Sequence, residues 1–270
     1  MDQKRNLWNF TPIWNNNQMK FNHHPNLLNS FRMLIVGSSG CGKTFLLLKM
    51  LLTPNFMDYN NLIIFSTTIN QPELQLIKLA FEQKLTKEAI INIFNNQDKY
   101  KNMSLGEIVE VFTKDSNNIS VEPINTLFSP DSTKITSPNN LKRTLDPASF
   151  VQPKNAKHLI IFDDVINNKN QDIMKQYYTR GRHNNCNCIY LSQNYFDLDK
   201  NNIRNNSNFF IFFKLNKTDK SNIYRDIFSS SFDKEQFDEA FEDCTSKKYG
   251  YLAYNKETET IMDSVFEDYS

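Results

Sequence analysis

The 270-residue chain carries 31 Lys and Arg against 30 Asp and Glu, a formal net charge of +1, and 39% of its residues are hydrophobic. These values are typical of a globular domain with a large core, and they exclude a disordered chain, a uniformly basic nucleic-acid coat and an acidic tail protein. The longest apolar runs, 33–36 and 159–162, are far shorter than the roughly 20 residues of a membrane span, so we expect no membrane partner. Four cysteines and the lack of an apolar signal core in residues 1–8 favour a reducing compartment.

Residues 1–29 are polar and Asn-rich, and we expect an N-terminal arm whose Trp8 and Trp14 either dock on the protein or belong to a loosely ordered leader. From residue 30 to 270, buried-strand runs alternate with helix-like spacing, which predicts one α/β domain with a mostly parallel, doubly wound sheet and helices on both faces. The predicted strands are 32–36, 62–65, 158–162, 188–191 and 209–215, with a terminal hairpin of 249–254 and 258–262. The predicted helices are 43–52, 71–83, 86–94, 105–112, 171–180, 219–228 and 234–241. Residues 115–157, rich in Ser, Thr, Asn and Pro, predict a long insertion.

Residues 37–44 form a complete G-x-x-x-x-G-K-[ST] loop between a predicted strand and a predicted helix, which is the context that gives the motif its meaning. Backbone N–H groups of such a loop wrap around phosphates, and the helix N-terminus adds a positive end. Lys43 is placed to reach the β- and γ-phosphates, and the Thr44 hydroxyl to bind Mg²⁺. The sequence therefore predicts ATP and Mg²⁺ as cofactors. The predicted nucleotide-binding residues are Gly37, Ser38, Ser39, Gly40, Cys41, Gly42, Lys43 and Thr44.

Two further strands end in polar side chains. Asp163 and Asp164 follow the apolar run 159–162, and Gln193 follows the strand at 188–191. At the carboxyl end of a parallel sheet, Asp163 can bind Mg²⁺, and Asp164 can orient and deprotonate the attacking water. Gln193 can hydrogen-bond the γ-phosphate or that water. An N-capping pair after the strand is the alternative for the two aspartates.

Arg182 lies between a predicted helix and a predicted strand, and we interpret it as a finger that an oligomer presents to the ATP of the next subunit. A solvated surface charge is the alternative. The neighbouring Arg180 is expected instead to complement the helix C-terminus.

These motifs together resemble one family. The chain is similar to the viral DNA-packaging ATPases of the poxvirus type, in the FtsK–HerA superfamily. The residues that carry this similarity are Phe31-Arg32-Met33 before the loop, the run 159–165, Gly181-Arg182-His183, and the run 190–193 followed by Tyr195. The resemblance covers residues 30–215. It implies a RecA/FtsK-like P-loop ATPase with Lys43 and Thr44 on MgATP, Asp163 on the metal, Asp164 as catalytic carboxylate, Gln193 as sensor and Arg182 as finger.

The resemblance also implies a function and partners. It implies a homo-oligomeric ring of five or six subunits that moves double-stranded DNA into a capsid and docks on a capsid or vertex protein. The implied location is the virus factory in the cytoplasm of an infected cell, with association with the virion as an extension. An AAA-like ATPase that remodels proteins or nucleoprotein without moving along DNA is the alternative function.

Three other patterns suggest a function, but each also has a purely structural or surface interpretation. Residues 216–219 match the guanine-reading N-K-x-D motif, but no Gly follows Asp163 where a GTPase needs one. Cys186 and Cys188 lie near His183, but they lack a second ligand pair, so small buried cysteines are the better interpretation. The candidates for basic pore residues are Lys200, Arg204, Lys217 and Lys220, each of which is otherwise a solvated charge.

Overall fold

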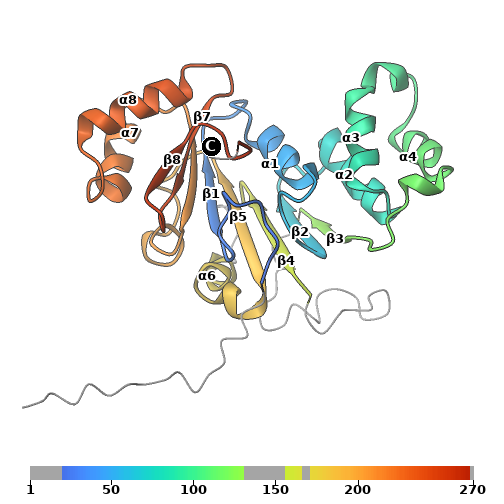
Figure 1. The fold of residues 1–270 in the computed structure, drawn as a ribbon, viewed down its shortest axis with the longest axis horizontal. Coiled ribbons are helices and arrows are strands. Elements are labelled where there is room, and N and C mark those ends of the chain that lie inside the picture. Colours follow the sequence, from blue (N-terminus) through green and yellow to red (C-terminus); the bar gives the residue numbers. More distant parts are fainter. Residues whose placement is uncertain (1–19, 131–155, 166–170, 268–270) are drawn as a thin grey trace, which may run out of the picture.

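The computed structural model describes residues 20–130, 156–165 and 171–267. Eight strands in this part of the chain form one sheet in the order β3-β2-β4-β5-β1-β6-β7-β8 (Figure 1). The strands are β1 Arg32–Val36, β2 Asn61–Ser66, β3 Asn125–Ser129, β4 His158–Asp163, β5 Cys186–Ser192, β6 Phe209–Phe213, β7 Tyr251–Asn255 and β8 Thr260–Met262. Strands β3 to β6 of that order are parallel, and β7 and β8 extend the sheet in antiparallel pairing. The predicted sheet and terminal hairpin are confirmed.

Helices cover both faces of the sheet (Figure 1). The α-helices are α1 Lys43–Leu52, α2 Pro72–Glu82, α3 Lys87–Asn95, α4 Leu105–Thr113, α6 Gln171–Arg180, α7 Lys217–Ile223 and α8 Lys234–Thr245. Short 3₁₀ turns are η1 Gln97–Tyr100, η2 Ser116–Asn118 and η5 Gly181–Asn184, and π-helical turns are η6 Lys200–Arg204 and η7 Tyr224–Phe228. Figure 1 shows α1 to α4 beside β2 and β3, with α7 and α8 at the opposite end of the sheet.

Alternate strand residues supply two separate cores. Leu34 points into a core that α6, η7 and α8 complete, whereas its neighbour Ile35 points into the core formed with α1 to α4. The same alternation applies along β4, where Ile160 and Ile161 enter opposite cores. Every residue of β2, β4, β5 and β6 is buried, and the middle of each strand is an apolar run, as expected of parallel strands that are covered on both faces.

The described end of the N-terminal arm packs on the domain. Phe21 and Leu27 are buried, and the Asn26 side chain donates to the carbonyls of Val265 and Glu267 at 3.2 and 2.6 Å. The His23 ring stacks on Phe21. Residues 20–29 therefore join the two ends of the described chain, while Trp8 and Trp14 lie outside the described residues.

The described part of the segment 115–157, in which the sequence predicts a long insertion and no strand is identified, contains β3 and the turn η2. β3 pairs with β2 at the edge of the sheet, and its first four residues are only half-buried. An edge strand of this kind lacks the apolar run by which the central strands are found. Residues 131–155 of the predicted insertion lie outside the described part of the chain.

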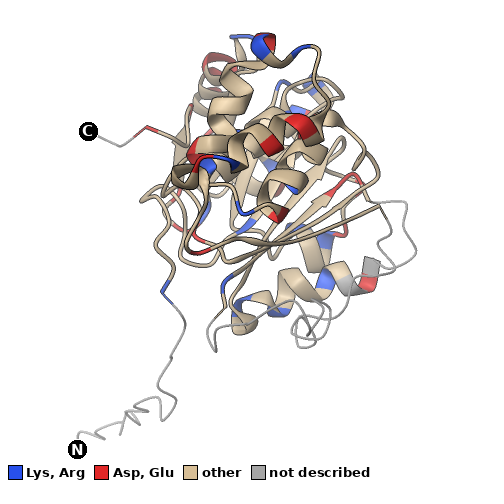
Figure 2. Cartoon of the chain, turned by 90° about the vertical axis from the view of Figure 1, so that its right-hand side faces the viewer, with Lys and Arg blue, Asp and Glu red and all other residues tan. Residues whose placement is uncertain are grey.

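Figure 2 shows basic and acidic residues interspersed along the helices that face the viewer. In the described ranges, no helix is both long and apolar enough to cross a lipid bilayer.

Candidate functional site

The loop between β1 and α1 has the backbone that a phosphate cradle needs. Its Gly40 and Gly42 adopt φ of 73° and 111°, in the left-handed region that glycine enters without steric cost. Gly42 is the N-cap of α1, so no side chain at that position caps the first N–H groups of the helix, and the first turn contains no acidic residue. The first N–H groups of α1 therefore point out of the helix end without a carboxylate to neutralise their positive field.

Close packing fixes the start of this loop. A Cβ on Gly37 would lie 2.7 Å from Cys41 Sγ and 2.7 Å from Phe213 Cβ, so the backbone here packs directly on β6. The Gly37 N–H donates to the Ser192 carbonyl at 3.2 Å, which ties the loop to the end of β5. The Lys43 ammonium donates to the carbonyls of Gly37 and Ser38, at 2.6 and 3.0 Å, and thus lies over the loop.

Asp163 ends β4 in a buried position, 7% exposed, and accepts two hydroxyl hydrogen bonds. Ser66 Oγ donates to its Oδ2 at 2.6 Å, and Thr68 Oγ1 to the same atom at 3.3 Å. Burial raises the pKa of the Asp163 carboxyl, and these two hydrogen bonds oppose the shift. A cation bound nearby stabilises the ionised form of such a buried carboxyl and lowers its raised pKa.

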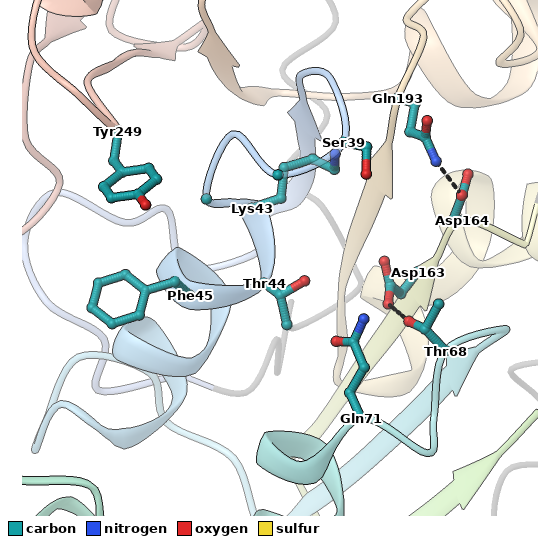
Figure 3. A pocket seen from close by; sticks show the side chains of 12 residues that line it. Ser39, Lys43, Thr44, Phe45, Thr68, Gln71, Asp163, Asp164, Gln193 and Tyr249 are labelled. Carbon is teal, nitrogen blue, oxygen red and sulfur yellow. Dashed lines mark hydrogen bonds between the residues drawn. The ribbon is translucent and has the colours of Figure 1, made fainter.

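Asp164 and Gln193 face each other across the ends of β4 and β5. Gln193 Nε2 donates to Asp164 Oδ2 at 2.6 Å (Figure 3). Asp164 has a φ of 50°, a left-handed conformation that Asp and Asn tolerate better than most residues, and its N–H donates to the Leu191 carbonyl at 3.1 Å. The turn after β4 thus directs the Asp164 side chain toward the neighbouring strand instead of along its own.

One cavity of about 730 Å³ joins these groups, a size suited to a small organic ligand. It is lined by Ser39, Gly40, Gly42, Lys43, Thr44, Phe45, Thr68, Gln71, Asp163, Asp164, Gln193 and Tyr249. The predicted site residues Lys43, Thr44, Asp163, Asp164 and Gln193 therefore lie together. The predicted residues Ser39, Gly40 and Gly42 also line the cavity. The sequence did not point to Phe45, Thr68, Gln71 and Tyr249, because they come from the exposed face of α1, from the β2–α2 turn and from the loop before β7.

Three predicted nucleotide-binding residues do not line the cavity. Gly37 and Ser38 offer carbonyls to Lys43, and the side chain of Cys41 turns toward Gly37 and the core. Burial raises the pKa of the Cys41 thiol, so the group is a small packed side chain in this structure.

Arg182 lies far from the cavity of its own chain. It belongs to η5, just before β5 begins at Cys186, whereas Gln193 follows the other end of that strand. Seven residues of strand separate the two ends by roughly 20 Å. The exposed Arg182 donates through Nε to His183 Nε2 at 3.3 Å. Within one chain, it cannot reach the other predicted site residues.

The remaining sequence patterns have structural roles. The N-K-x-D match is a helix cap, since Asn216 Oδ1 accepts from the Asp219 N–H at 2.8 Å at the start of α7. Cys186 and Cys188 are buried free thiols in one core. Among the described residues, no three His, Cys, Asp or Glu side chains group as a metal site.

Three of the four candidate pore residues form ion pairs within the chain, and the weakest pair joins the exposed Lys200 to Asp226 at 3.9 Å. The Arg204 side chain, 10% exposed, pairs with Asp226 at 2.9 Å and lies over the Tyr195 ring. Lys220 pairs with Asp238 and Glu242 at 3.2 and 2.8 Å. These two cations hold the loop after β5 and the α7–α8 pair in place, so they are not the free charges that the sequence interpretation required.

The family model of the poxvirus A32 protein matches residues 122–268, more than half of the chain. The chain belongs to the poxvirus A32 protein family. The matched segment of this A32 family member includes Asp163, Asp164, Arg182, Gln193 and Tyr249. It overlaps the resemblance noted in the sequence and extends it through β7 and β8. The phosphate loop precedes the match, and its motif and backbone make the chain a P-loop ATPase.

The genome packaging NTPase B204 of Sulfolobus turreted icosahedral virus 2, in complex with ATP-gammaS, is 17% identical over 86% of this chain and 95% of its own, with a TM-score of 0.48. VirB4 of Thermoanaerobacter pseudethanolicus is 11% identical over 87% of this chain and 88% of its own, with a TM-score of 0.43. No curated protein matches the A32 family member by sequence.

Proposed function

We propose that this A32 family member is a Mg²⁺-dependent ATPase motor that moves double-stranded DNA into a viral capsid. One observation carries the ATPase part: the phosphate loop, Asp163 and the Asp164–Gln193 pair meet in one cavity at the ends of the adjacent strands β1, β5 and β4. Family membership supports the packaging part. The motor is proposed to work as a homo-oligomeric ring of five or six subunits on a capsid or vertex protein, in the cytoplasm of the infected cell or on the virion.

The residues fit a divalent cation on an ATP phosphate. Among the described residues, hydrogen bonds to Asp163 go to Oδ2 alone, so the hydroxyls of Ser66 and Thr68 fix this carboxylate while Oδ1 stays available. Asp163 and Thr44, both lining the cavity, are the proposed Mg²⁺ residues. Bound Mg²⁺ would neutralise phosphate charge during transfer.

The chain itself supplies the other steps. Lys43 moves its ammonium from the loop carbonyls to the β- and γ-phosphates, where it stabilises developing negative charge. Asp164 orients the attacking water and accepts its proton, and Gln193 holds that carboxylate through the 2.6 Å hydrogen bond. Arg182, distant from its own cavity, is proposed to complete the cavity of the next subunit.

The test is ATP turnover by the purified full chain with and without double-stranded DNA of mixed sequence. Asp164→Asn serves as the inactive blank, because Asn tolerates the same left-handed backbone and keeps an oxygen for Gln193. Asp98→Asn, which changes a fully exposed carboxylate, is the matched control. Loss of the general base lowers the rate about 10²- to 10⁴-fold.

Stimulation of the wild-type rate by DNA supports the motor. Turnover that ignores DNA supports the second candidate, an AAA-like remodeller of proteins or nucleoprotein, which the interspersed surface charge and the engaged Arg204 and Lys220 favour. Turnover by Asp164→Asn at the wild-type rate contradicts the catalytic assignment. Full turnover without Mg²⁺ contradicts the metal dependence.

A further inference from the structure

Two aromatic side chains lie exposed in the cavity where the proposed hydrolysis assigns them no role. Phe45 is 71% exposed and Tyr249 is 54% exposed, and both line the cavity. They are two of the four large apolar side chains that the described residues leave exposed. Each exposed ring forgoes part of the stabilisation that burial would give, so two such rings in one cavity point to a ligand that covers them.

The two rings lie at one end of that cavity. In Figure 3, Phe45 and Tyr249 are on one side of Lys43 and Thr44, whereas Asp163 and Gln193 are on the other. A nucleoside triphosphate whose γ-phosphate reaches the carboxylates and whose β-phosphate lies at Lys43 must extend its base toward the two rings. The order of groups along the cavity therefore matches the order of groups along the ligand.

The backbone holds both rings in place. Phe45 is the third residue of α1, and the next three residues of that helix are buried, so the ring cannot turn into the core without displacing them. Tyr249 has a φ of 65°, and its Cδ1 lies 3.2 Å from the position of a Cβ on Gly42. A Cβ on Gly250 would lie 2.4 Å from the Cys244 carbonyl oxygen, so the turn before β7 has no room to shift.

We propose that Phe45 and Tyr249 form a stacking site for the base of the bound nucleotide. Their rings contact the base by its π-face, which every base offers. Asp163, Asp164 and Gln193 lie at the other end of the cavity, with Lys43 and Thr44 between the two ends. The site therefore binds purine nucleotides with little discrimination between adenine and guanine. This inference rests on the proposed function, because it places the phosphates in the loop at residues 37–44.

Binding of three ligands, ATP, GTP and inorganic tripolyphosphate, separates base contacts from phosphate contacts. For the full-length Tyr249→Ala and Phe45→Ala variants, we expect affinity for ATP and for GTP to fall about 5- to 100-fold, which is the range of base–aromatic stacking. Affinity for tripolyphosphate should stay at the wild-type value. Tyr249→Phe keeps the ring and should bind all three ligands like the wild type.

A fluorescence measurement gives a second readout that needs no turnover. In Tyr249→Trp, the indole emission should change when ATP or GTP binds but not when tripolyphosphate binds. For the two alanine variants, Val111→Ala is the matched control, because it removes an exposed apolar side chain on α4 that does not line the cavity. The alanine variants keep the backbone strain at residue 249 constant, because Tyr and Ala are both L-residues with a Cβ.

Three outcomes overturn the stacking site. Unchanged ATP affinity in both alanine variants means that the rings do not touch the base. Equal losses for ATP and tripolyphosphate mean that the rings support the loop instead, through the contact of Tyr249 with Gly42. If the wild-type protein binds ATP and GTP no more tightly than tripolyphosphate, the stacking site alone is refuted. If it binds neither the nucleotides nor tripolyphosphate, the proposed function is refuted.

Discussion

Replacing Gly37 by Ala tests whether the phosphate loop is positioned by contact with β6. The added methyl would lie 2.7 Å from Cys41 Sγ and 2.7 Å from Phe213 Cβ, well inside van der Waals contact. Phe213 Cβ is attached to the backbone of a buried strand, so it cannot rotate away. Overpacking of this kind costs about 1–3 kcal/mol of unfolding free energy. In a domain of this size, that lowers the melting temperature by roughly 2–10 °C.

Urea unfolding measures the loss, and Gly106→Ala is the matched control. A Cβ on Gly106 meets nothing within 4 Å, and its place inside α4 predicts a gain of up to about 1 kcal/mol. In the Gly37→Ala background, Cys41→Ala removes the sulfur from one of the two clashes and should restore part of the stability, as coupled sites do. Wild-type stability of Gly37→Ala would refute the reasoning, as would no recovery with Cys41→Ala.

Three other predictions concern single side chains. Burial raises the pKa of Asp163, so the contribution of its carboxyl group to folding stability is present at low pH and is lost as pH rises through that pKa. Asp163→Asn should therefore be more stable than the wild type in urea at pH 7 and should show no gain in stability near pH 3. The same variant should lose its stabilisation by MgATP. Asp226→Ala leaves the nearly buried Arg204 unpaired and should cost about 1–3 kcal/mol in the same assay, which a drop below about 0.3 kcal/mol would contradict. Arg182→Ala should be inactive alone yet regain turnover in rings mixed with Lys43→Ala, and no recovery on mixing contradicts a finger acting between subunits.

The central strands and the phosphate loop could be predicted because their signals are local. β4 is a continuous apolar run that is buried on both faces and ends at Asp163, and the motif at residues 37–44 carries its own strand and helix on either side. β3 gave no such signal, since it is an edge strand of mixed composition in a polar segment. Local sequence thus locates the strands that are buried on both faces and misses the edge strand β3, although it does locate the edge strand β8 as part of the terminal hairpin.

The partners of the predicted residues could not be found in this way. Ser66 at the end of β2 and Thr68 in the turn after it fix Asp163 from nearly a hundred positions earlier in the chain, and Tyr249 reaches Gly42 from about two hundred positions later. A serine at a strand end or a tyrosine before a glycine has no spacing relation to a P-loop. The prediction of Arg204 as a pore residue failed to foresee its ion pair for the same reason, because only the fold brings Asp226 beside it.

The order of the strands decides what Gln193 can do. The sequence places this residue at the end of a strand, but a strand end lies beside the phosphates only if that strand neighbours β1 or β4. β5 lies between the two, with Asp163 in register with Leu191 and Val36 in register with Ser192. If β4 paired directly with β1, the amide would lie outside the cavity and Asp164 would lack its donor. The crossover that inserts β5 therefore couples the proposed base to the phosphate loop, and it does so through neighbouring residues on a rigid sheet instead of a mobile loop.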